Sequence, residues 1–299
     1  MPRTRRLLTA LAMIGTLAAS ALTAAAAPAA AAVTDVGIQA QPAMQLPFPC
    51  GQTWNGNGSN SSAHVGWELD FNRGGSATAD LGDTVLAAAA GTIAIASYQT
   101  GNRYGNLVKI DHGGSYTTYY AHLSTMAVKV GEYVDRGQVI GSLGNTSAPG
   151  NNISPHLHFE LRYGTNYPNN TVKAIFNGST FGYPSANVTS NNCATSYDPA
   201  EVCGSGFKVN DSARLGGKGN VVLLWNASTS SNCVVTLKFT SKGTATATSA
   251  YLEPAGSNRT TDSGNYGYYA GPVKRTAPNC IKWGGATGGV AYNSPSEHC

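Results

Sequence analysis

The chain has 299 residues, of which only 11% are charged, and its formal net charge is +4. Without Arg3, Arg5 and Arg6 the net charge is +1, so the composition gives no reason to expect a nucleic-acid partner. No segment beyond the N-terminal region offers about twenty consecutive apolar residues. We therefore expect the mature chain to have no membrane anchor.

The N-terminal segment has the pattern of a secretory signal peptide. Three arginines precede an apolar stretch from Leu7 to Leu22, and a run of small residues extends from there to Ala32. We expect residues 1–32 to be removed and the protein to be secreted, extracellular or associated with the cell wall. The pair Arg5-Arg6 leaves both the general secretory route and the twin-arginine route open.

The cysteines favour disulfide bonds, because an even set in an exported chain is rarely used for thiolate chemistry. The six are Cys50, Cys193, Cys203, Cys233, Cys280 and Cys299. The natural pairing joins Cys50 to Cys193 and connects the last four among themselves, although sequence alone leaves the connectivity open.

The first part of the mature chain, residues 33–193, is predicted to be an all-β domain with an antiparallel sheet. Turn residues separate short runs that are rich in β-branched and aromatic side chains. The expected strands are Thr84–Ala89, Gly91–Tyr98, Leu107–Asp111, Tyr116–His122, Gln138–Leu143 and His156–Tyr163. The stretch from Asn177 to Asn192, rich in Asn, Ser, Gly and Pro, marks the end of this domain.

Residues 194–299 are predicted to form a small accessory β domain that disulfides hold together. Its expected strands are Val221–Trp225, Cys233–Phe239 and Thr244–Leu252. Nowhere in the chain does an amphipathic helix of convincing length appear.

The tripeptide His156-Leu157-His158 is the strongest indication of chemistry. Strand side chains repeat every two residues, so both imidazoles project from one face and could serve one metal ion. His64 precedes Asp70 by six residues, and His122 closes a predicted strand. Two imidazoles and one carboxylate, with a fourth position for water, make a recurring catalytic zinc site, and the remaining histidines are then free for acid–base work.

Residues 46–185 resemble the LytM/lysostaphin-like zinc endopeptidases, which include the β-lytic metallopeptidases. The shared pieces occur in the family's order: Gly105-Asn106-Leu107-Val108-Lys109-Ile110-Asp111-His112-Gly113, Tyr120-Ala121-His122-Leu123, the run from Gly131 to Gly141, and Pro155-His156-Leu157-His158-Phe159-Glu160. The resemblance implies an antiparallel β groove of the duplicated hybrid motif type, with one Zn²⁺ per chain on its floor.

Position by position, the resemblance implies that His64, Asp70 and His158 bind zinc and that His122 and His156 are catalytic. His156 would take a proton from the water and return it to the leaving amine, while His122 would orient the water or stabilise the oxyanion. These two roles can be exchanged.

The carboxylate ligand remains open between two residues. In many relatives the aspartate ligand follows the histidine ligand by four residues, which in this chain is the position of Glu68. Both Glu68 and Asp70 share strand parity with His64. We favour Asp70, because Leu69-Asp70-Phe71 resembles the longer-spaced β-lytic members. His112, in a predicted turn, is assigned a structural or neutral role.

The resemblance implies hydrolysis of peptide bonds in bacterial cell-wall peptidoglycan, in stem peptides or cross-bridges. Two alternatives are a non-catalytic wall-binding or regulatory module and a protease of Gly-rich extracellular proteins. We expect the protein to act on peptidoglycan peptides as a monomer.

Residues 200–299 resemble the spore-associated protein A family of actinomycetes. The shared pieces include Val202-Cys203-Gly204-Ser205-Gly206, Asn232-Cys233-Val234-Val235-Thr236 and the terminal Glu297-His298-Cys299. This resemblance implies an exported, disulfide-bonded accessory domain, and targeting to the wall or spore surface is a hypothesis for its role.

Overall fold

The computed structural model describes residues 40–58, 64–195 and 197–299, of which Ala40–Cys299 belong to one compact unit. The predicted signal peptide, residues 1–32, lies outside the described residues. Regular structure in the described ranges is nearly all β, which confirms the predicted fold class; the one helix found there is α1 (Pro199–Cys203). No helix in these ranges has the length and apolar character needed to cross a membrane.

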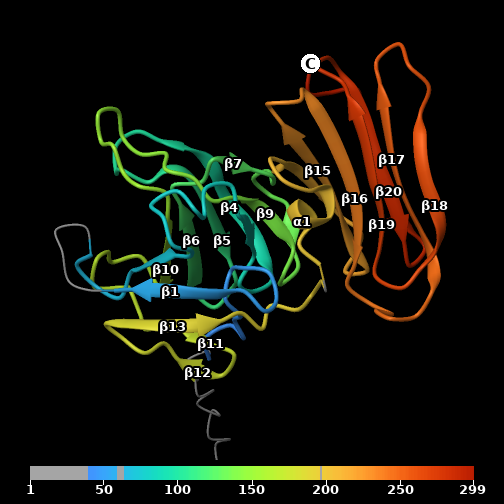
Figure 1. The fold of residues 1–299 in the computed structure, drawn as a ribbon. Helices are drawn as coiled ribbons and strands as arrows, with labels where there is room; N and C mark the ends of the chain where they lie inside the picture. Colours follow the sequence, from blue (N-terminus) through green and yellow to red (C-terminus); the bar gives the residue numbers. More distant parts are fainter. Residues whose placement is uncertain (1–39, 59–63, 196) are drawn as a thin grey trace, which may run out of the picture. The chain divides into compact units, whose positions relative to one another are not determined.

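An antiparallel sheet of eight strands forms the framework of the first region (Figure 1). Listed across the sheet, its strands are β13 (Ser185–Thr189), β1 (Thr53–Asn57), β2 (Leu69–Asn72), β10 (Leu157–Tyr163), β6 (Tyr116–Ala121), β5 (Gly105–Asp111), β4 (Gly91–Gln99) and β8 (Tyr133–Val134). A three-stranded sheet contains β3 (Thr84–Leu86), β9 (Val139–Ser142) and β7 (Thr125–Met126), and a short hairpin joins β11 (Ile175–Phe176) to β12 (Ser179–Thr180).

Strand β10 lies near the middle of the large sheet, between β2 and β6, and is buried on both faces. Its apolar residues Leu157, Phe159 and Leu161 belong to the hydrophobic core. Because alternate residues of a strand point to opposite faces, the polar residues between them are directed away from that core. The sequence of β10 thus places a row of ionisable side chains inside the protein.

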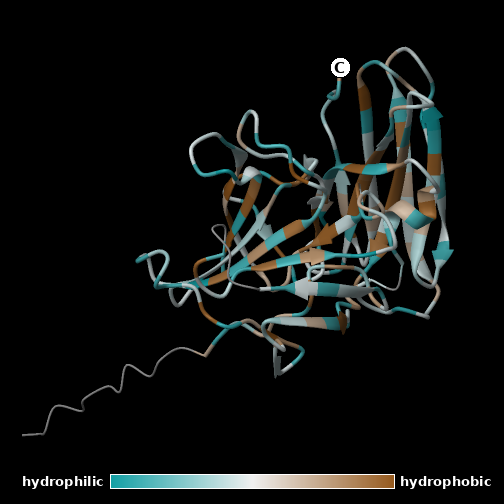
Figure 2. Cartoon of the chain, turned by 60° about the vertical axis from the view of Figure 1, so that its left-hand side comes forward, coloured by the Kyte–Doolittle hydropathy of each residue, from teal (hydrophilic) through white to brown (hydrophobic). Residues whose placement is uncertain are grey.

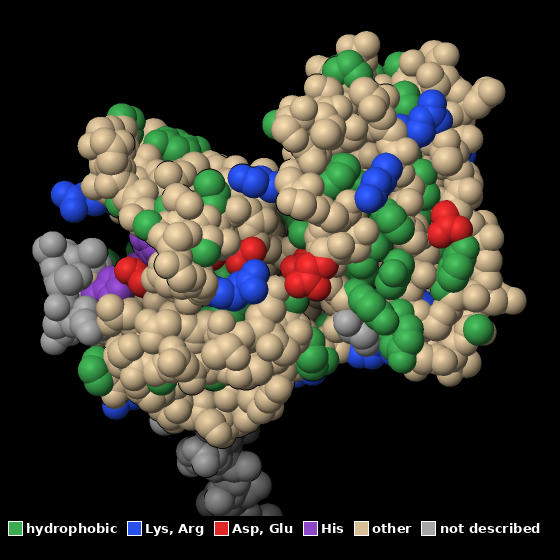
Figure 3. Space-filling model, viewed as in Figure 1, with side chains coloured by type: hydrophobic (Ala, Val, Ile, Leu, Met, Phe, Trp, Pro, Cys, Tyr) green, Lys and Arg blue, Asp and Glu red, His purple; other side chains and the backbone are tan. Residues whose placement is uncertain are grey.

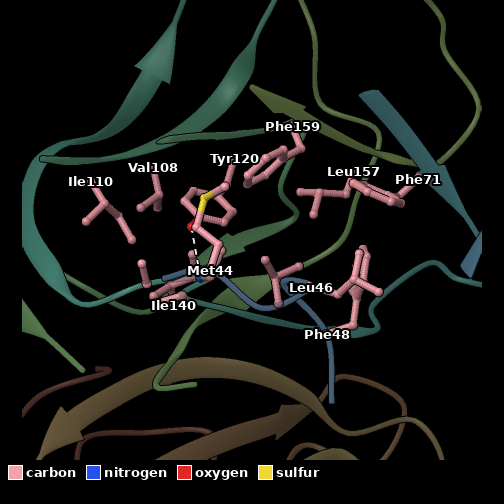
Figure 4. Packing of buried hydrophobic residues seen from close by; sticks show 14 of the residues in the cluster. Met44, Leu46, Phe48, Phe71, Val108, Ile110, Tyr120, Ile140, Leu157 and Phe159 are labelled. Atoms are coloured by element: carbon pink, nitrogen blue, oxygen red, sulfur yellow. Dashed lines mark hydrogen bonds between the residues drawn. The ribbon is translucent and has the colours of Figure 1, made fainter. Parts of the chain in front are cut away.

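The core beneath the sheet is aromatic at its centre. Phe71 contacts Phe48, Phe159 and Phe176 edge-on, an arrangement that aromatic quadrupoles favour. Figure 4 shows the rings of Phe48, Phe71 and Phe159 in this core, together with the side chain of Leu46 from the N-terminal segment. The hydroxyl of Tyr120 accepts a hydrogen bond from the Ala88 backbone amide at 2.9 Å, so this buried ring also has a polar partner.

Two four-stranded antiparallel sheets form the region after α1. One contains β14 (Lys208–Arg214), β15 (Gly219–Asn226), β16 (Ser231–Lys238) and β19 (Tyr269–Thr276); the other contains β18 (Thr260–Tyr266), β17 (Thr246–Pro254), β20 (Ile281–Thr287) and β21 (Val290–Asn293). Apolar residues such as Val234, Leu252 and Trp283 are packed together between them. Figure 2 shows hydrophobic residues on several of these strands and hydrophilic ones on the outermost strand and at loops.

A further apolar cluster includes residues from both sides of the predicted boundary at residue 193. Leu86 and Val139 from the first region belong to the same cluster as Val209 and Val222. The boundary between residues 33–193 and 194–299 stays a prediction from the sequence.

Three disulfide bonds are present: Cys50–Cys193, Cys203–Cys233 and Cys280–Cys299. The Cys50–Cys193 bond was predicted, as was pairing of the last four cysteines among themselves, but the sequence did not indicate which of those four are joined. The first bond closes a loop of 143 residues, so it removes much conformational freedom from the unfolded chain.

Candidate active site

Strand register brings the predicted site residues together. In the pairing of β10 with β2, His158 lies directly opposite Asp70, and in the pairing with β6 it lies opposite Ala121, the residue before His122. His156 precedes β10 and forms an isolated bridge with Gly144. His64 lies in the segment that leads into β2. Three separate segments therefore supply the predicted site residues, which meet at one point.

The carboxylate of Asp70 lies between two imidazoles. Its Oδ1 is 3.1 Å from His64 Nε2 and 3.0 Å from His158 Nδ1. The ligand atoms of these three residues all lie within 4.8 Å of one another. Tetrahedral zinc with bonds of about 2.0–2.2 Å separates neighbouring ligand atoms by about 3.3 Å. The donor set and its spacing thus fit one zinc ion.

Glu68 does not take part in this cluster. It is fully buried, and its carboxylate accepts hydrogen bonds from the Gly66 amide at 2.7 Å and from the Tyr167 hydroxyl at 3.4 Å. Asp70 is therefore the carboxylate that faces both His64 and His158, while Glu68 is engaged by the loop beside it.

His122 and His156 lie next to each other, with ring centroids 4.6 Å apart. The Nδ1 of His122 is 2.8 Å from the Thr146 carbonyl oxygen, and the Nδ1 of His156 is 2.8 Å from the Ser154 carbonyl oxygen. A carbonyl can only accept, so each ring donates from Nδ1. In the neutral form, each Nε2 then carries a lone pair that can accept a proton.

His122 has an unusual backbone conformation. Its φ is +63°, in the left-handed region that non-glycine residues seldom adopt. Its amide donates a hydrogen bond of 2.9 Å to the Tyr104 carbonyl, which helps to hold this conformation. Such strain recurs at functional sites, where surrounding structure fixes a side chain in a required direction.

Ionisation of Asp70 and His158 is coupled. Burial alone would raise the pKa of Asp70, but hydrogen bonds from His158 and His64 outweigh it and hold that pKa far below its usual range. Burial lowers the pKa of His158, yet hydrogen bonds to Asp70 and Glu160 dominate and raise it to about 10. Without a metal ion, the site therefore keeps a carboxylate beside an imidazolium.

The pKa of His122 shifts in the opposite direction to that of His158, because burial dominates at His122. Burial lowers the pKa of this imidazole to about 3, with further contributions from the neighbouring His156 and His158. His122 is consequently neutral at ordinary pH. His112, in contrast, lies outside the site, where its ring nitrogens are 2.8 Å from the Ala90 carbonyl oxygen and 2.7 Å from the Thr118 hydroxyl.

A layer of polar side chains lies behind His158. Its Nε2 is 2.9 Å from Oε1 of Glu160, which is fully buried. Arg162 pairs with the other oxygen of Glu160, and Tyr104 donates to Oε1 at 2.6 Å. Strand alternation in the sequence placed Glu160 and Arg162 on the same face as His158, but no sequence signal pointed to Tyr104, which comes from the loop before β5.

The candidate catalytic and metal-binding residues line one cavity of about 690 Å³, a size typical of ligand sites. Its lining residues are His64, Asp70, Asn102, Arg103, Tyr104, His122, Asn151, Ile153, His156, His158 and Tyr167. Figure 3 shows histidine side chains reaching the surface beside an acidic side chain. The side chains of Asp70 and His156 are 29% and 16% exposed, so a substrate can reach the site from solvent.

Residues 70–172 match peptidase family M23. The chain is 41% identical over 94 residues to peptidoglycan DD-endopeptidase ShyC of Vibrio cholerae and 35% identical over 119 residues to lysostaphin of Staphylococcus simulans. These alignments cover 31% and 39% of this chain, and the chain spans 21% of the length of each relative. The chain therefore carries a peptidase domain of family M23, which confirms the LytM/lysostaphin-like resemblance.

Over 130 residues the chain is 37% identical to spore-associated protein A of Streptomyces coelicolor, an alignment that covers 43% of this chain and 82% of that protein. The chain belongs to the family of spore-associated protein A. Among solved structures, the catalytic domain of lysostaphin from Staphylococcus simulans is 26% identical, with a TM-score of 0.32, over 43% of this chain and 84% of that one.

Proposed function

We propose that this protein is an exported zinc endopeptidase that hydrolyses peptide bonds of bacterial cell-wall peptidoglycan. One observation carries the proposal: Asp70 Oδ1 lies 3.1 Å from His64 Nε2 and 3.0 Å from His158 Nδ1, in the cavity that His122 and His156 also line. The names of the relatives, a peptidoglycan DD-endopeptidase and lysostaphin, support the substrate.

His64, Asp70 and His158 would hold the metal ion. They offer two imidazole nitrogens and one carboxylate oxygen, the donor types that zinc takes in hydrolases. When bound, zinc would lower the pKa of a water molecule and polarise the scissile carbonyl.

His156 is the candidate general base. Its Nδ1 is 2.8 Å from the Ser154 carbonyl oxygen, and its Nε2 is 3.6 Å from Asp70 Oδ1, so Nε2 is directed into the metal-binding cluster. At that nitrogen it would accept a proton from the nucleophile and later donate it to the leaving amine. The hydrogen bond to the carbonyl keeps the ring in this orientation.

His122 would orient the nucleophile beside His156. The low pKa keeps its imidazole neutral, and its Nδ1–H is committed to Thr146, so Nε2 can accept a hydrogen bond but cannot donate one. This favours positioning of the nucleophile over stabilisation of an oxyanion, which would need a protonated ring.

Export completes the proposal, because peptidoglycan lies outside the cytoplasm. We assign residues 1–32 as a signal peptide, residues 33–193 as the peptidase domain and residues 194–299 as the accessory domain. The even number of cysteines, all joined in disulfides, agrees with an oxidising environment.

Digestion of purified peptidoglycan tests the function. The full chain with zinc should release fragments whose masses show cleavage of peptide bonds, and His156→Ala at equal zinc content should release almost none. Release of fragments cut only in the glycan strand would contradict the proposal. Retention on peptidoglycan without any cleavage would favour a wall-binding module, and faster cleavage of a Gly-rich protein would favour a protein substrate.

A further inference from the structure

The imidazole of His158 is held from both sides by carboxylates. Nδ1 is 3.0 Å from Asp70 Oδ1, and Nε2 is 2.9 Å from Glu160 Oε1. An ionised carboxylate can only accept, so the proton on Nε2 is directed at Glu160. Nδ1 is then the nitrogen that faces Asp70 and His64.

Glu160 has no freedom to turn away from His158. It is fully buried, Tyr104 donates to Oε1 at 2.6 Å, and Arg162 pairs with Oε2. Arg162 also donates from Nη2 to the Tyr104 hydroxyl at 2.7 Å, which closes a ring of three side chains. A buried carboxylate needs such partners, because an ionised carboxylate that is removed from water without hydrogen bonds is strongly destabilising.

Arg162 is itself clamped between two aromatic rings. Its guanidinium carbon lies 4.1 Å from the ring centroid of Tyr119 and 3.9 Å from that of Tyr167. Cation–π contacts of this kind hold a planar guanidinium in place. The clamp therefore fixes Arg162, Arg162 fixes Glu160, and Glu160 faces His158.

We propose that Glu160, held by Arg162 and Tyr104, is a positioning residue that keeps Nε2 of His158 occupied and so presents Nδ1 to the metal ion. This inference rests on the proposed function, in which His158 is a metal ligand. When a metal-binding imidazole donates its other N–H to a carboxylate that does not bind the metal, this hydrogen bond orients the ring and strengthens metal binding. The network acts on affinity through His158 and does not touch the substrate.

Two double variants separate orientation from packing. Glu160→Gln with Arg162→Met keeps an oxygen acceptor opposite Nε2, whereas Glu160→Met with Arg162→Met removes it; both remove the buried ion pair. We expect zinc affinity, measured by competition with a chelating dye on the full chain, to fall about 10–100-fold more in the second variant than in the first. Equal affinities in the two variants would overturn the proposal.

Wild-type protein provides a readout that does not depend on folding of a variant. Long-range proton–nitrogen NMR spectra of the zinc-loaded chain should show His158 protonated at Nε2 and metal-bound at Nδ1. Metal binding through Nε2 would refute the positioning role.

Asp198→Asn is the matched control for the affinity measurement. It alters a buried carboxylate that accepts a hydrogen bond from Thr84, and it should leave zinc affinity unchanged.

The failure of this inference can be told apart from failure of the proposed function. If His158→Ala keeps a full equivalent of zinc, the ligand assignment itself is wrong. If His158→Ala loses zinc but the two double variants bind it equally, the ligand assignment stands and only the role of Glu160 is refuted.

Discussion

Buried ionisable side chains are satisfied differently in the sheet that holds the site and in the sheets after α1. On β10, the side chains of His158, Glu160 and Arg162 contact one another beside a cavity. On β16, the buried ammonium of Lys238 donates to the Thr244 and Tyr266 carbonyls at 2.8 Å and to the Thr246 hydroxyl at 2.6 Å.

This difference teaches where chemistry is to be sought. A side chain such as Lys238, which donates to two backbone carbonyls and one hydroxyl, completes the hydrogen bonding of the fold. Where ionisable side chains contact each other at an accessible cavity, the surrounding protein shifts their pKa values, as it does for Asp70 and His122. Changes to the ionisable side chains around Asp70 and His158 should therefore affect metal content and catalysis, whereas a change at Lys238 should affect only stability.

The largest expected effect is a difference in zinc content between variants of His156 and His158, which are two residues apart. His158→Ala should lose both zinc and activity, because it removes a proposed metal ligand. His156→Ala should keep zinc while kcat falls about 10²–10⁴-fold, the range for loss of a general base. Metal analysis and peptidoglycan turnover on the same samples check both. Loss of zinc from the His156 variant would show that the division between ligand and base is wrong.

The next effect distinguishes the two carboxylates. Asp70→Asn should lose most of its zinc, because a neutral amide is a poor ligand, whereas Glu68→Gln should keep it, since Glu68 contacts Gly66 and Tyr167 instead. Zinc content after dialysis measures this. A Glu68 variant that loses zinc while Asp70→Asn retains it would reverse the assignment.

Lys238 tests the second region. Lys238→Met fills a similar volume but removes the hydrogen-bond donor to three partly buried oxygen acceptors, so the free energy of unfolding should fall by about 1–3 kcal/mol. Urea unfolding gives the stability, and zinc content and kcat of the folded variant should equal those of the wild type. A change in zinc content would mean that the two regions are not separable in this way.

The smallest expected effect is the release of a proton when zinc binds. Since His158 has a pKa of about 10 in the metal-free protein, it is protonated at pH 7 and must lose that proton to bind zinc. Zinc uptake should release about one proton, and affinity should weaken about tenfold for each pH unit that the pH falls. Calorimetry in two buffers of different ionisation enthalpy measures the release; none at pH 7 would contradict the pKa.

Much of the fold could be predicted because apolar alternation marks central strands. The expected strands His156–Tyr163 and Tyr116–His122 correspond to β10 and β6 within one residue at an end. Outer strands were not predicted. β13 and β18 are edge strands with few apolar residues, Ser-Ala-Asn-Val-Thr and Thr-Thr-Asp-Ser-Gly-Asn-Tyr, so nothing in their sequences distinguishes them from loops.

The arrangement of the candidate site could be predicted only in part, for a similar reason. Strand parity placed His156 and His158 on one face. Parity could not distinguish Glu68 from Asp70, because both lie an even number of residues from His64. Only the register of β2 against β10 places Asp70 opposite His158. Tyr104 lies 56 residues from Glu160 in a loop, where no periodicity applies. Contacts across that distance depend on the folded chain.

Anomalous diffraction at the zinc edge from crystals of the full chain tests the central claim most directly. We predict one strong peak, about 2.0–2.2 Å from His64 Nε2, Asp70 Oδ1 and His158 Nδ1. A peak coordinated by Glu68 or lying outside this cavity would contradict the account.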